Sequence, residues 1–316
     1  MTEERDLSAA KVAESAAGPP AEPPGAGFPV FLRDSIPFVL LRLVLYLALF
    51  QTIGYGLSAL LVRMAPWTAA QSVAGLLIQE VLSFSAAAGT ALIMARAERR
   101  SFGAYGLPVR NAFGKLFWQG ALLGLAELCA VMSLIAVFGA YRFGPLAIHG
   151  AGLLRWGLTW AFFFLAVGFS EEFLFRGYVQ FTLAKGIGFW PAAVFLSTLF
   201  AAAHLGKGNA GENWVGALGI LVIGLFWCLT LRRTGSLWFA VGMHASFDFG
   251  ETFLFSVPNS GVTFEGHLSK ATMHGAAWLT GGAVGPEASI FNFVIIGLLF
   301  YLFHRWYPAK AEPTRE

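Results

Sequence analysis

The sequence predicts an all-α, polytopic membrane protein, a bundle of about eight transmembrane helices. Of its 316 residues, 57% are apolar and only 12% are charged, whereas soluble domains carry roughly a quarter charged residues. Its apolar stretches approach the length of about 20 residues that a helix needs to cross a bilayer. Lys and Arg also favour alternate connections between these stretches. Together these observations favour one bundle of membrane helices over two soluble domains.

The first 33 residues form a predicted cytoplasmic tail. Residues 1–28 are rich in Ala, Pro, Gly and Glu and contain no apolar run, a composition typical of disorder. They do not resemble a signal peptide, because no basic start is followed by a short apolar core and a cleavage site. Membrane insertion is therefore expected to depend on the first transmembrane helix.

Residues 34–308 form one predicted transmembrane domain, and residues 309–316 form a short C-terminal tail. In chain order, the expected spans are Leu43–Val62, Val73–Ala95, Leu116–Ala140, Leu153–Phe175, Phe189–His204, Trp214–Leu231, Leu237–Val257 and Ala288–His304. The fifth span is short, so its neighbours are expected to shelter it. The Gly-rich segment Gly206–Glu212 turns the chain after it, and Pro258–Glu287 connects the last two spans.

The distribution of charge predicts the orientation. With eight spans, the two tails and alternate loops share one side, which holds 16 of the Lys and Arg residues against 5 on the other. Cytoplasmic loops carry the excess of Lys and Arg, so both termini are expected in the cytoplasm and the chain in the plasma membrane, surrounded by lipid. The net charge of +3, without a long basic cluster, argues against a nucleic-acid partner.

Polar side chains interrupt three of the apolar stretches. They are Glu171, Glu172 and Arg176 at the end of the fourth, His204 at the end of the fifth, and His244 and Asp248 within the seventh. Charges in hydrocarbon cost at least a few kcal/mol, so residues of this kind are functional candidates by default. At about 1.5 Å of rise per residue, all three sites reach the middle part of a bilayer about 30 Å thick. We therefore expect them to meet in one cavity.

The spacing of the two adjacent glutamates predicts different tasks for them. Glu172 and Arg176 are four residues apart, so they lie on one helical face and can pair. Glu171 is rotated by about 100° from Glu172 and points elsewhere, which leaves its carboxylate available as a general base. A glutamate and His204 can together activate a water. The implied reaction is attack of water on an amide inside the membrane.

The plainer interpretation is structural. Glu172 and Arg176 would then be a salt-bridged helix end, and each intramembrane His would be a hydrogen-bonded packing residue. The occurrence of three such sites at similar depth argues against this interpretation. His244 and Asp248 are again four residues apart on one face, where they can hold a substrate carbonyl or a metal ion.

The three sites together resemble a known family. The motifs Glu171-Glu172-x-x-x-Arg176, Phe200-x-x-x-His204 and His244-x-x-x-Asp248 are similar to the signature of the CPBP intramembrane proteases. This family includes the type II CAAX prenyl endopeptidases and bacteriocin-processing relatives. The resemblance covers residues 96–289, and two flanking stretches, Glu98–Leu107 and Trp278–Glu287, resemble bacterial members.

The resemblance implies an eight-helix bundle with a polar chamber open toward the cytoplasm. It implies an endopeptidase that cleaves a membrane-embedded or lipidated peptide, although a prenylated substrate is not required. The implied roles are water activation by Glu171 and His204, support of the site by Glu172 and Arg176, and stabilisation of the oxyanion by His244 and Asp248.

Asp248 occupies a position where many members of this family have Asn. An ionised Asp cannot donate a hydrogen bond to an oxyanion. Asp248 is therefore protonated, or it orients His244, or it binds a metal.

Zinc is the one cofactor that the sequence raises. Catalytic zinc takes three protein ligands and an open position for water, and His204, His244 and Glu171, or Asp248 in place of Glu171, supply that number. The usual His-Glu-x-x-His helix is absent. The resemblance leaves both a metalloprotease and a metal-free glutamate mechanism open.

Two other classes of function fit the composition. A non-catalytic membrane scaffold would keep the fold for binding partners and would tolerate Glu171→Gln. A proton-coupled transporter would use the further intramembrane acids Glu80, Glu127 and Glu251. Such a transporter is expected to contain an internal inverted repeat, and the sequence shows none.

Overall fold

Apolar helices make up most of the computed structural model, which describes residues 34–69, 72–206 and 211–309. In chain order, the α-helices are α2 (Ile36–Met64), α3 (Val73–Ala97), α4 (Lys115–Val137), α5 (Ala151–Arg176), α6 (Tyr178–Ile187), α7 (Phe189–Gly206), α8 (Trp214–Thr234), α9 (Trp238–Phe249), α10 (Ala277–Thr280) and α11 (Ile290–Trp306). The predicted all-α class is confirmed. The predicted tail at residues 1–33 and most of the predicted Gly-rich turn lie outside the described residues.

Each predicted span coincides with a helix, but the helices differ in length. Within the described ranges, five are long and apolar enough to cross a membrane: α2, α3, α4, the stretch from α5 through α6, and α8. The helices α7 and α11 are apolar but shorter, and α9 has 12 residues. Some of the predicted spans are therefore long helices, and the others, at α7, α9 and α11, are shorter helices that pack among them.

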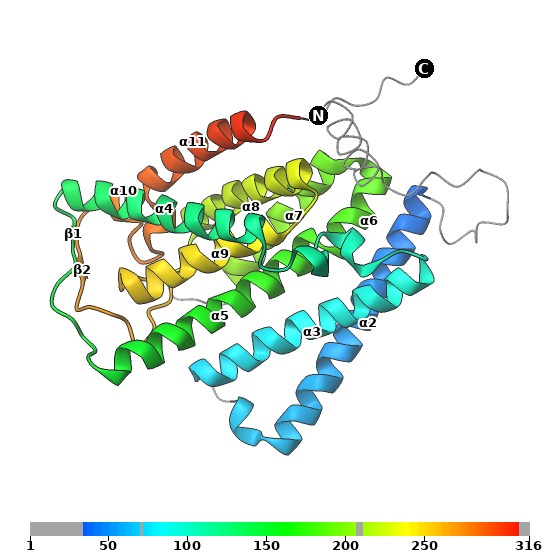
Figure 1. Cartoon of the computed structure of the whole chain (residues 1–316), viewed down its shortest axis with the longest axis horizontal. Helices are drawn as coiled ribbons and strands as arrows, with labels where there is room; N and C mark the ends of the chain where they lie inside the picture. The colour runs from blue at the N-terminus through cyan, green and yellow to red at the C-terminus, as the bar shows by residue number, and fades with distance from the viewer. Residues whose placement is uncertain (1–33, 70–71, 207–210, 310–316) are drawn as a thin grey trace, which may run out of the picture. The chain divides into compact units, whose positions relative to one another are not determined.

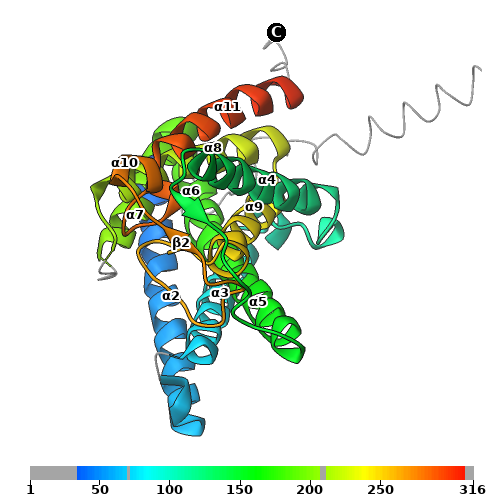
Figure 2. The same ribbon diagram turned by 90° about the vertical axis from the view of Figure 1, so that its left-hand side faces the viewer.

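The helix α9 lies near the middle of the bundle. It packs against α4 on one side and α5 on another, α5 contacts α3, and α2 completes that edge (Figure 1). The helices α7 and α8 pack on each other, and α11 contacts α4 and α8. The small antiparallel pair β1 (Tyr141–Arg142) and β2 (Thr272–Met273) lies with α10 at one end of the bundle (Figure 1), and this end faces the viewer in Figure 2.

Glycines permit the close approach of α4 to α9. A Cβ atom on Gly120 would meet the carbonyl oxygen of Phe239, and one on Gly242 would meet the carbonyl oxygen of Phe117. Small residues of this kind let membrane helices pack backbone to backbone. The contact fixes the position of α9 and therefore of the polar residues that α9 carries.

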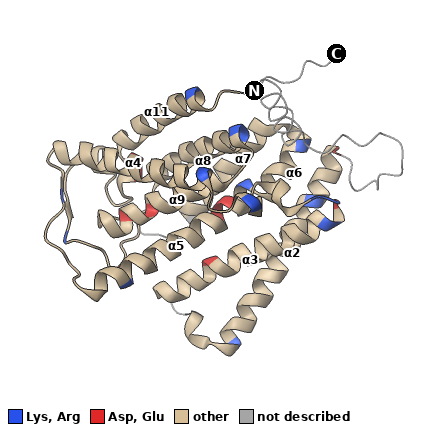
Figure 3. Cartoon of the chain, viewed as in Figure 1, with Lys and Arg blue, Asp and Glu red and all other residues tan. Residues whose placement is uncertain are grey.

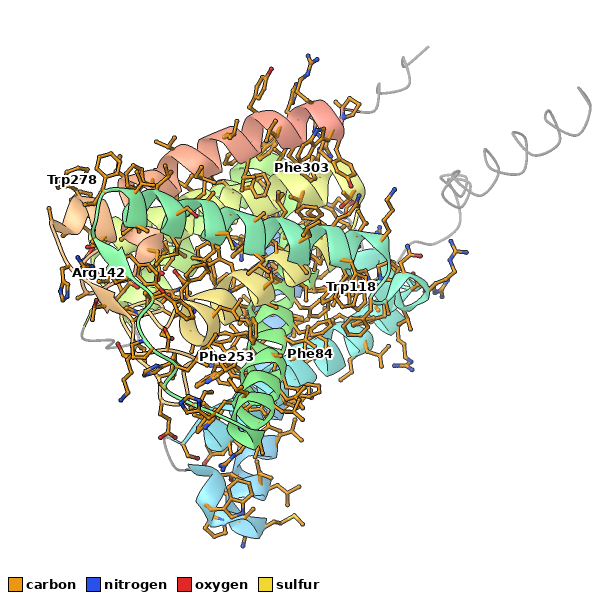
Figure 4. All side chains as sticks on the ribbon, turned by 60° about the vertical axis from the view of Figure 1, so that its left-hand side comes forward. Phe84, Trp118, Arg142, Phe253, Trp278 and Phe303 are labelled. Carbon is orange, nitrogen blue, oxygen red and sulfur yellow. The ribbon has the colours of Figure 1, made fainter. Side chains whose placement is uncertain are left out.

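Aromatic side chains fill the space beside α5. A buried cluster is formed by Trp160, Phe163 and Phe164 of α5 together with Phe253. Phe253 is labelled in Figure 4. Phe253 belongs to η5 (Gly250–Leu254), a π-helical turn that directly continues α9. The prediction of one continuous span over Leu237–Val257 missed this change of helix type. Such turns widen a helix and occur frequently at functional sites.

A polar network ties the end of α3 to α6. Glu98 accepts hydrogen bonds from the hydroxyl groups of Tyr105 (3.1 Å) and Tyr178 (2.5 Å), and the Lys185 amino group lies 3.8 Å from the same carboxylate. Burial and the Glu98 charge raise the pKa of Tyr105. Figure 3 shows many of the Lys and Arg residues near this end, whereas several acids lie among the helices.

Candidate active site

Helix α5 places the two adjacent glutamates of the site. Glu172 and Arg176 are fully buried, and Arg176 Nη1 donates a hydrogen bond to Glu172 Oε1 over 3.2 Å. The predicted pairing four residues apart is therefore present. Glu171, on the neighbouring face of α5, lines a cavity that lies between the helices.

Aromatic rings hold the Arg176 guanidinium in place. Its central carbon lies 4.4 Å from the ring centroid of Phe200 and 5.4 Å from that of Trp227. Cation–π contacts of this kind strengthen when they are desolvated. Gly224 of α8 makes room for the guanidinium, because a Cβ atom there would meet Arg176 Nη2. The charge of Glu172 is thus balanced by the Arg176 guanidinium, which side chains of α7 and α8 hold in position.

Helix α7 supplies His204, which is 7% exposed. Its Nδ1 lies 2.9 Å from the carbonyl oxygen of Phe200, one turn earlier. A carbonyl only accepts hydrogen bonds, so Nδ1 carries the proton. In the neutral imidazole, Nε2 then presents a lone pair. This Nε2 lies 3.8 Å from Glu171 Oε2.

Helix α9 supplies His244 and Asp248. The Nδ1 of His244 lies 3.0 Å from Glu172 Oε1, and its Nε2 lies 3.4 Å from Asp248 Oδ2 and 3.8 Å from Glu171 Oε2. The ring stacks on Trp227 at a centroid distance of 4.5 Å and an interplanar angle of 17°. The carboxyl groups of Glu171, Glu172 and Asp248 thus surround one imidazole ring.

The structure thus brings the sequence-predicted residues together at one place. Glu171, His204, His244 and Asp248 line the same cavity of about 170 Å³. Glu172 and Arg176 lie behind it and contact it through His244. Two imidazole Nε2 atoms and two carboxylates meet there, inside a bundle of apolar helices.

Sequence reasoning missed two parts of this cavity. Trp227, the ring under His244, lies in an apolar helix where an aromatic residue gives no signal of its own. Glu287 and Asn292 also line the cavity. Glu287 is the last residue of the stretch Trp278–Glu287. A charged residue among apolar neighbours was the sequence feature that could have identified it.

Zinc ligation does not fit the side chains as they are placed. Within residues 34–69, 72–206 and 211–309, no group of three or more His, Cys, Asp or Glu side chains has the spacing of a metal site. Each His Nε2 lies 3.8 Å from Glu171 Oε2. Tetrahedral ligands at about 2.0 to 2.1 Å from zinc lie only about 3.3 Å apart.

The fold and the site define a multi-pass helical membrane protein with a buried acid–imidazole site. Residues 152–250 match the family model described as Type II CAAX prenyl endopeptidase Rce1-like. This segment begins in α5, ends just after α9 and includes every predicted site residue. The resemblance to the CPBP intramembrane proteases is thereby confirmed over this segment. No curated protein and no solved structure matches the chain.

Proposed function

We propose that the chain is an intramembrane endopeptidase that hydrolyses a peptide bond with a water activated by Glu171 and His204. One observation carries the proposal: Glu171 Oε2 lies 3.8 Å from both His204 Nε2 and His244 Nε2, inside a cavity between membrane helices. Polar atoms at this separation are too far apart for a direct hydrogen bond, and a bridging water suits such a gap.

The reaction follows from the roles that these atoms can take. The Glu171 carboxylate takes a proton from the water, with the His204 Nε2 lone pair holding the same water. The oxygen attacks the substrate carbonyl, and the developing oxyanion is stabilised by the His244 Nε2–H. Protonated Glu171 then gives its proton to the leaving amine, so the C–N bond breaks and both products are neutral at the reacting atoms.

Glu172 and Arg176 prepare His244 for this task. Glu172 Oε1 accepts from His244 Nδ1 over 3.0 Å and from Arg176 Nη1 over 3.2 Å. This contact fixes the orientation of the ring, as outer carboxylates do for histidines in other sites. Asp248 supports the oxyanion from the other side, as a donor when protonated.

The substrate of this proposal is a peptide segment that reaches the site from the membrane. The apolar walls of the bundle suit a membrane-embedded segment, and the matched family model supports a C-terminal CAAX-type peptide that carries a lipid. We place the protein in the plasma membrane with both termini in the cytoplasm, in agreement with the 16-to-5 distribution of Lys and Arg.

The test is proteolysis by the purified full chain in detergent. A farnesylated C-terminal peptide and non-lipidated apolar peptides are incubated with the parent protein, with Glu171→Gln and with Glu265→Gln, and products are identified by mass spectrometry. Glu265 is an exposed acid outside the site, so it is the matched control. Loss of a general base typically costs 10²- to 10⁴-fold, and we expect that loss for Glu171→Gln alone. Full proteolytic activity in Glu171→Gln would remove Glu171 from the mechanism. Absence of cleavage of every peptide by the parent protein would favour the scaffold instead.

A further inference from the structure

The cavity contains a second group of polar residues beyond the candidate active site, which we call the acidic end. It consists of Glu127 on α4, Glu251 in η5, Glu287 in η6 (Pro286–Ala288), and Asn292 on α11. These four residues are buried: in the same order, they are 3%, 1%, 8% and 3% exposed. Four separate elements therefore bring buried polar groups to one part of the cavity.

Several oxygen atoms of the acidic end have no hydrogen-bond partner among the described residues. Both carboxylate oxygens of Glu127, Oε1 of Glu251, Oε2 of Glu287 and Oδ1 of Asn292 lack a hydrogen-bond partner within the described part of the chain. The donor side of Asn292 is already used, because its Nδ2 donates to the Glu287 carbonyl oxygen over 3.0 Å. Leaving buried acceptors unpaired is costly, so this surface is complementary to a ligand rich in donors.

The acidic end also lacks a cation of its own. Glu251 and Glu287 are hydrogen-bonded to each other, which requires that they share a proton. The backbone N–H of Ser260 donates to Glu287 Oε1 over 2.6 Å. Burial raises the pKa of Glu287 to about 7. Among the described residues that line the cavity, none is Lys or Arg.

The acidic end lies within reach of the candidate active site. Glu251 follows His244 by seven residues, which corresponds to about 10 Å along the helix, and both residues line the same cavity. An extended peptide covers that distance in about three residues. A residue close to the scissile bond can therefore extend its side chain into the acidic end.

We propose that the acidic end binds the cationic side chain, Arg or Lys, of a residue within about three positions of the scissile bond. This inference rests on the proposed function, because it names a substrate feature of the same site. A guanidinium presents five donors in a planar fork, which matches acceptors spread over four elements. A bare metal ion matches less well, since no described group of acids has the spacing of a metal site.

The test uses apolar ten-residue peptides, each with a single arginine at a successive position and a twin that carries neutral citrulline there. Binding to the full-length parent protein in detergent is measured by competition, and cleavage is mapped by mass spectrometry. We expect the best arginine peptide to bind at least about ten-fold more tightly than its citrulline twin, as charge-assisted hydrogen bonds predict. Equal affinity of every pair would overturn the proposal without the need for any variant.

Isosteric variants then locate the preference. Glu127→Gln and Glu251→Gln should each reduce the arginine-to-citrulline ratio toward one, whereas the exposed control Glu265→Gln should leave it unchanged. An arginine-to-citrulline ratio that stays unchanged in both Glu127→Gln and Glu251→Gln would contradict the assignment of arginine binding to the acidic end. The binding and cleavage results also separate the two proposals. Arginine preference without cleavage supports the subsite and rejects the peptidase, and cleavage without preference does the reverse.

Discussion

The Nδ1 of His244 lies 3.0 Å from Glu172 Oε1, and this hydrogen bond joins α9 to α5 inside the bundle. The same oxygen accepts from Arg176 Nη1. Glu172 is therefore committed to two donors, while Glu171, one residue earlier, lines the cavity. Two chemically identical side chains in succession thus take different places: Glu172 holds His244 and Arg176, and Glu171 lines the cavity.

The first prediction concerns Glu172→Gln. The amide oxygen can still accept hydrogen bonds, but the charge that faces His244 and Arg176 is lost. We expect kcat to fall about 10- to 100-fold, as happens when an outer carboxylate is removed, with KM nearly unchanged. Steady-state kinetics on a cleaved peptide measure both values. The variant Glu265→Gln, at an exposed position, is the control. An unchanged kcat in Glu172→Gln would contradict a role of Glu172 in catalysis.

The second prediction concerns Arg176→Ala. This change removes a fully buried cation and leaves the Glu172 carboxylate buried with one partner fewer. Breaking a buried ion pair costs about 3 to 5 kcal/mol, so we expect a lower yield of monodisperse protein and an earlier thermal transition in detergent. Arg142→Ala, at an exposed arginine labelled in Figure 4, is the control. Equal stability of the two variants would contradict the structural role of Arg176.

Much of this architecture could be predicted because hydrophobicity reports directly on the environment. Each apolar stretch of the sequence forms a helix, and the polar interruptions at Glu171, His204 and His244 converge as expected. The spacing of four residues also gave the Glu172–Arg176 pair, because helical periodicity is local.

The remaining features depend on contacts between helices, which sequence spacing does not encode. The bond from Glu172 to His244 spans 72 residues, and no local rule connects the two positions. The stacking of Trp227 under His244 depends on how α8 packs beside α9. The π-helical turn after Phe249 was likewise invisible in the apolar pattern, because an apolar helix of either type has the same composition.

The third prediction concerns topology. The helix order and the 16-to-5 distribution of Lys and Arg place the connection after α3 in the cytoplasm and the segment between α9 and α11 on the opposite side. Single cysteines at the exposed positions Ser101 and Thr263, in a background without Cys129 and Cys228, should react with an impermeant thiol reagent from opposite faces. Ser101 should label only after permeabilisation. Labelling of both from one face would exclude the eight-span arrangement.

The fourth prediction concerns zinc. The 3.8 Å separations of Glu171 Oε2 from the two histidines suit a bridging water better than direct ligation of one metal. We therefore expect proteolysis to persist after dialysis against a chelator, and elemental analysis to find much less than one zinc per chain. His204→Ala and His244→Ala should lose activity with no change in metal content. One zinc per chain that either alanine variant removes would establish the zinc mechanism.

The fifth prediction concerns Asp248, whose Oδ2 lies 3.4 Å from His244 Nε2. A carboxyl group at this place donates to an oxyanion only while it is protonated, whereas an amide donates at every pH. If Asp248 acts as a donor, Asp248→Asn retains substantial activity, and its pH–rate profile extends to higher pH than that of the parent. If Asp248 acts as an anion that orients His244, the same change lowers kcat about 10- to 100-fold at every pH. We expect the first result, because the amide matches the carboxyl in size and faces the same cavity. The comparison needs full pH–rate profiles of both proteins, with Asp248→Ala as the variant that removes either role.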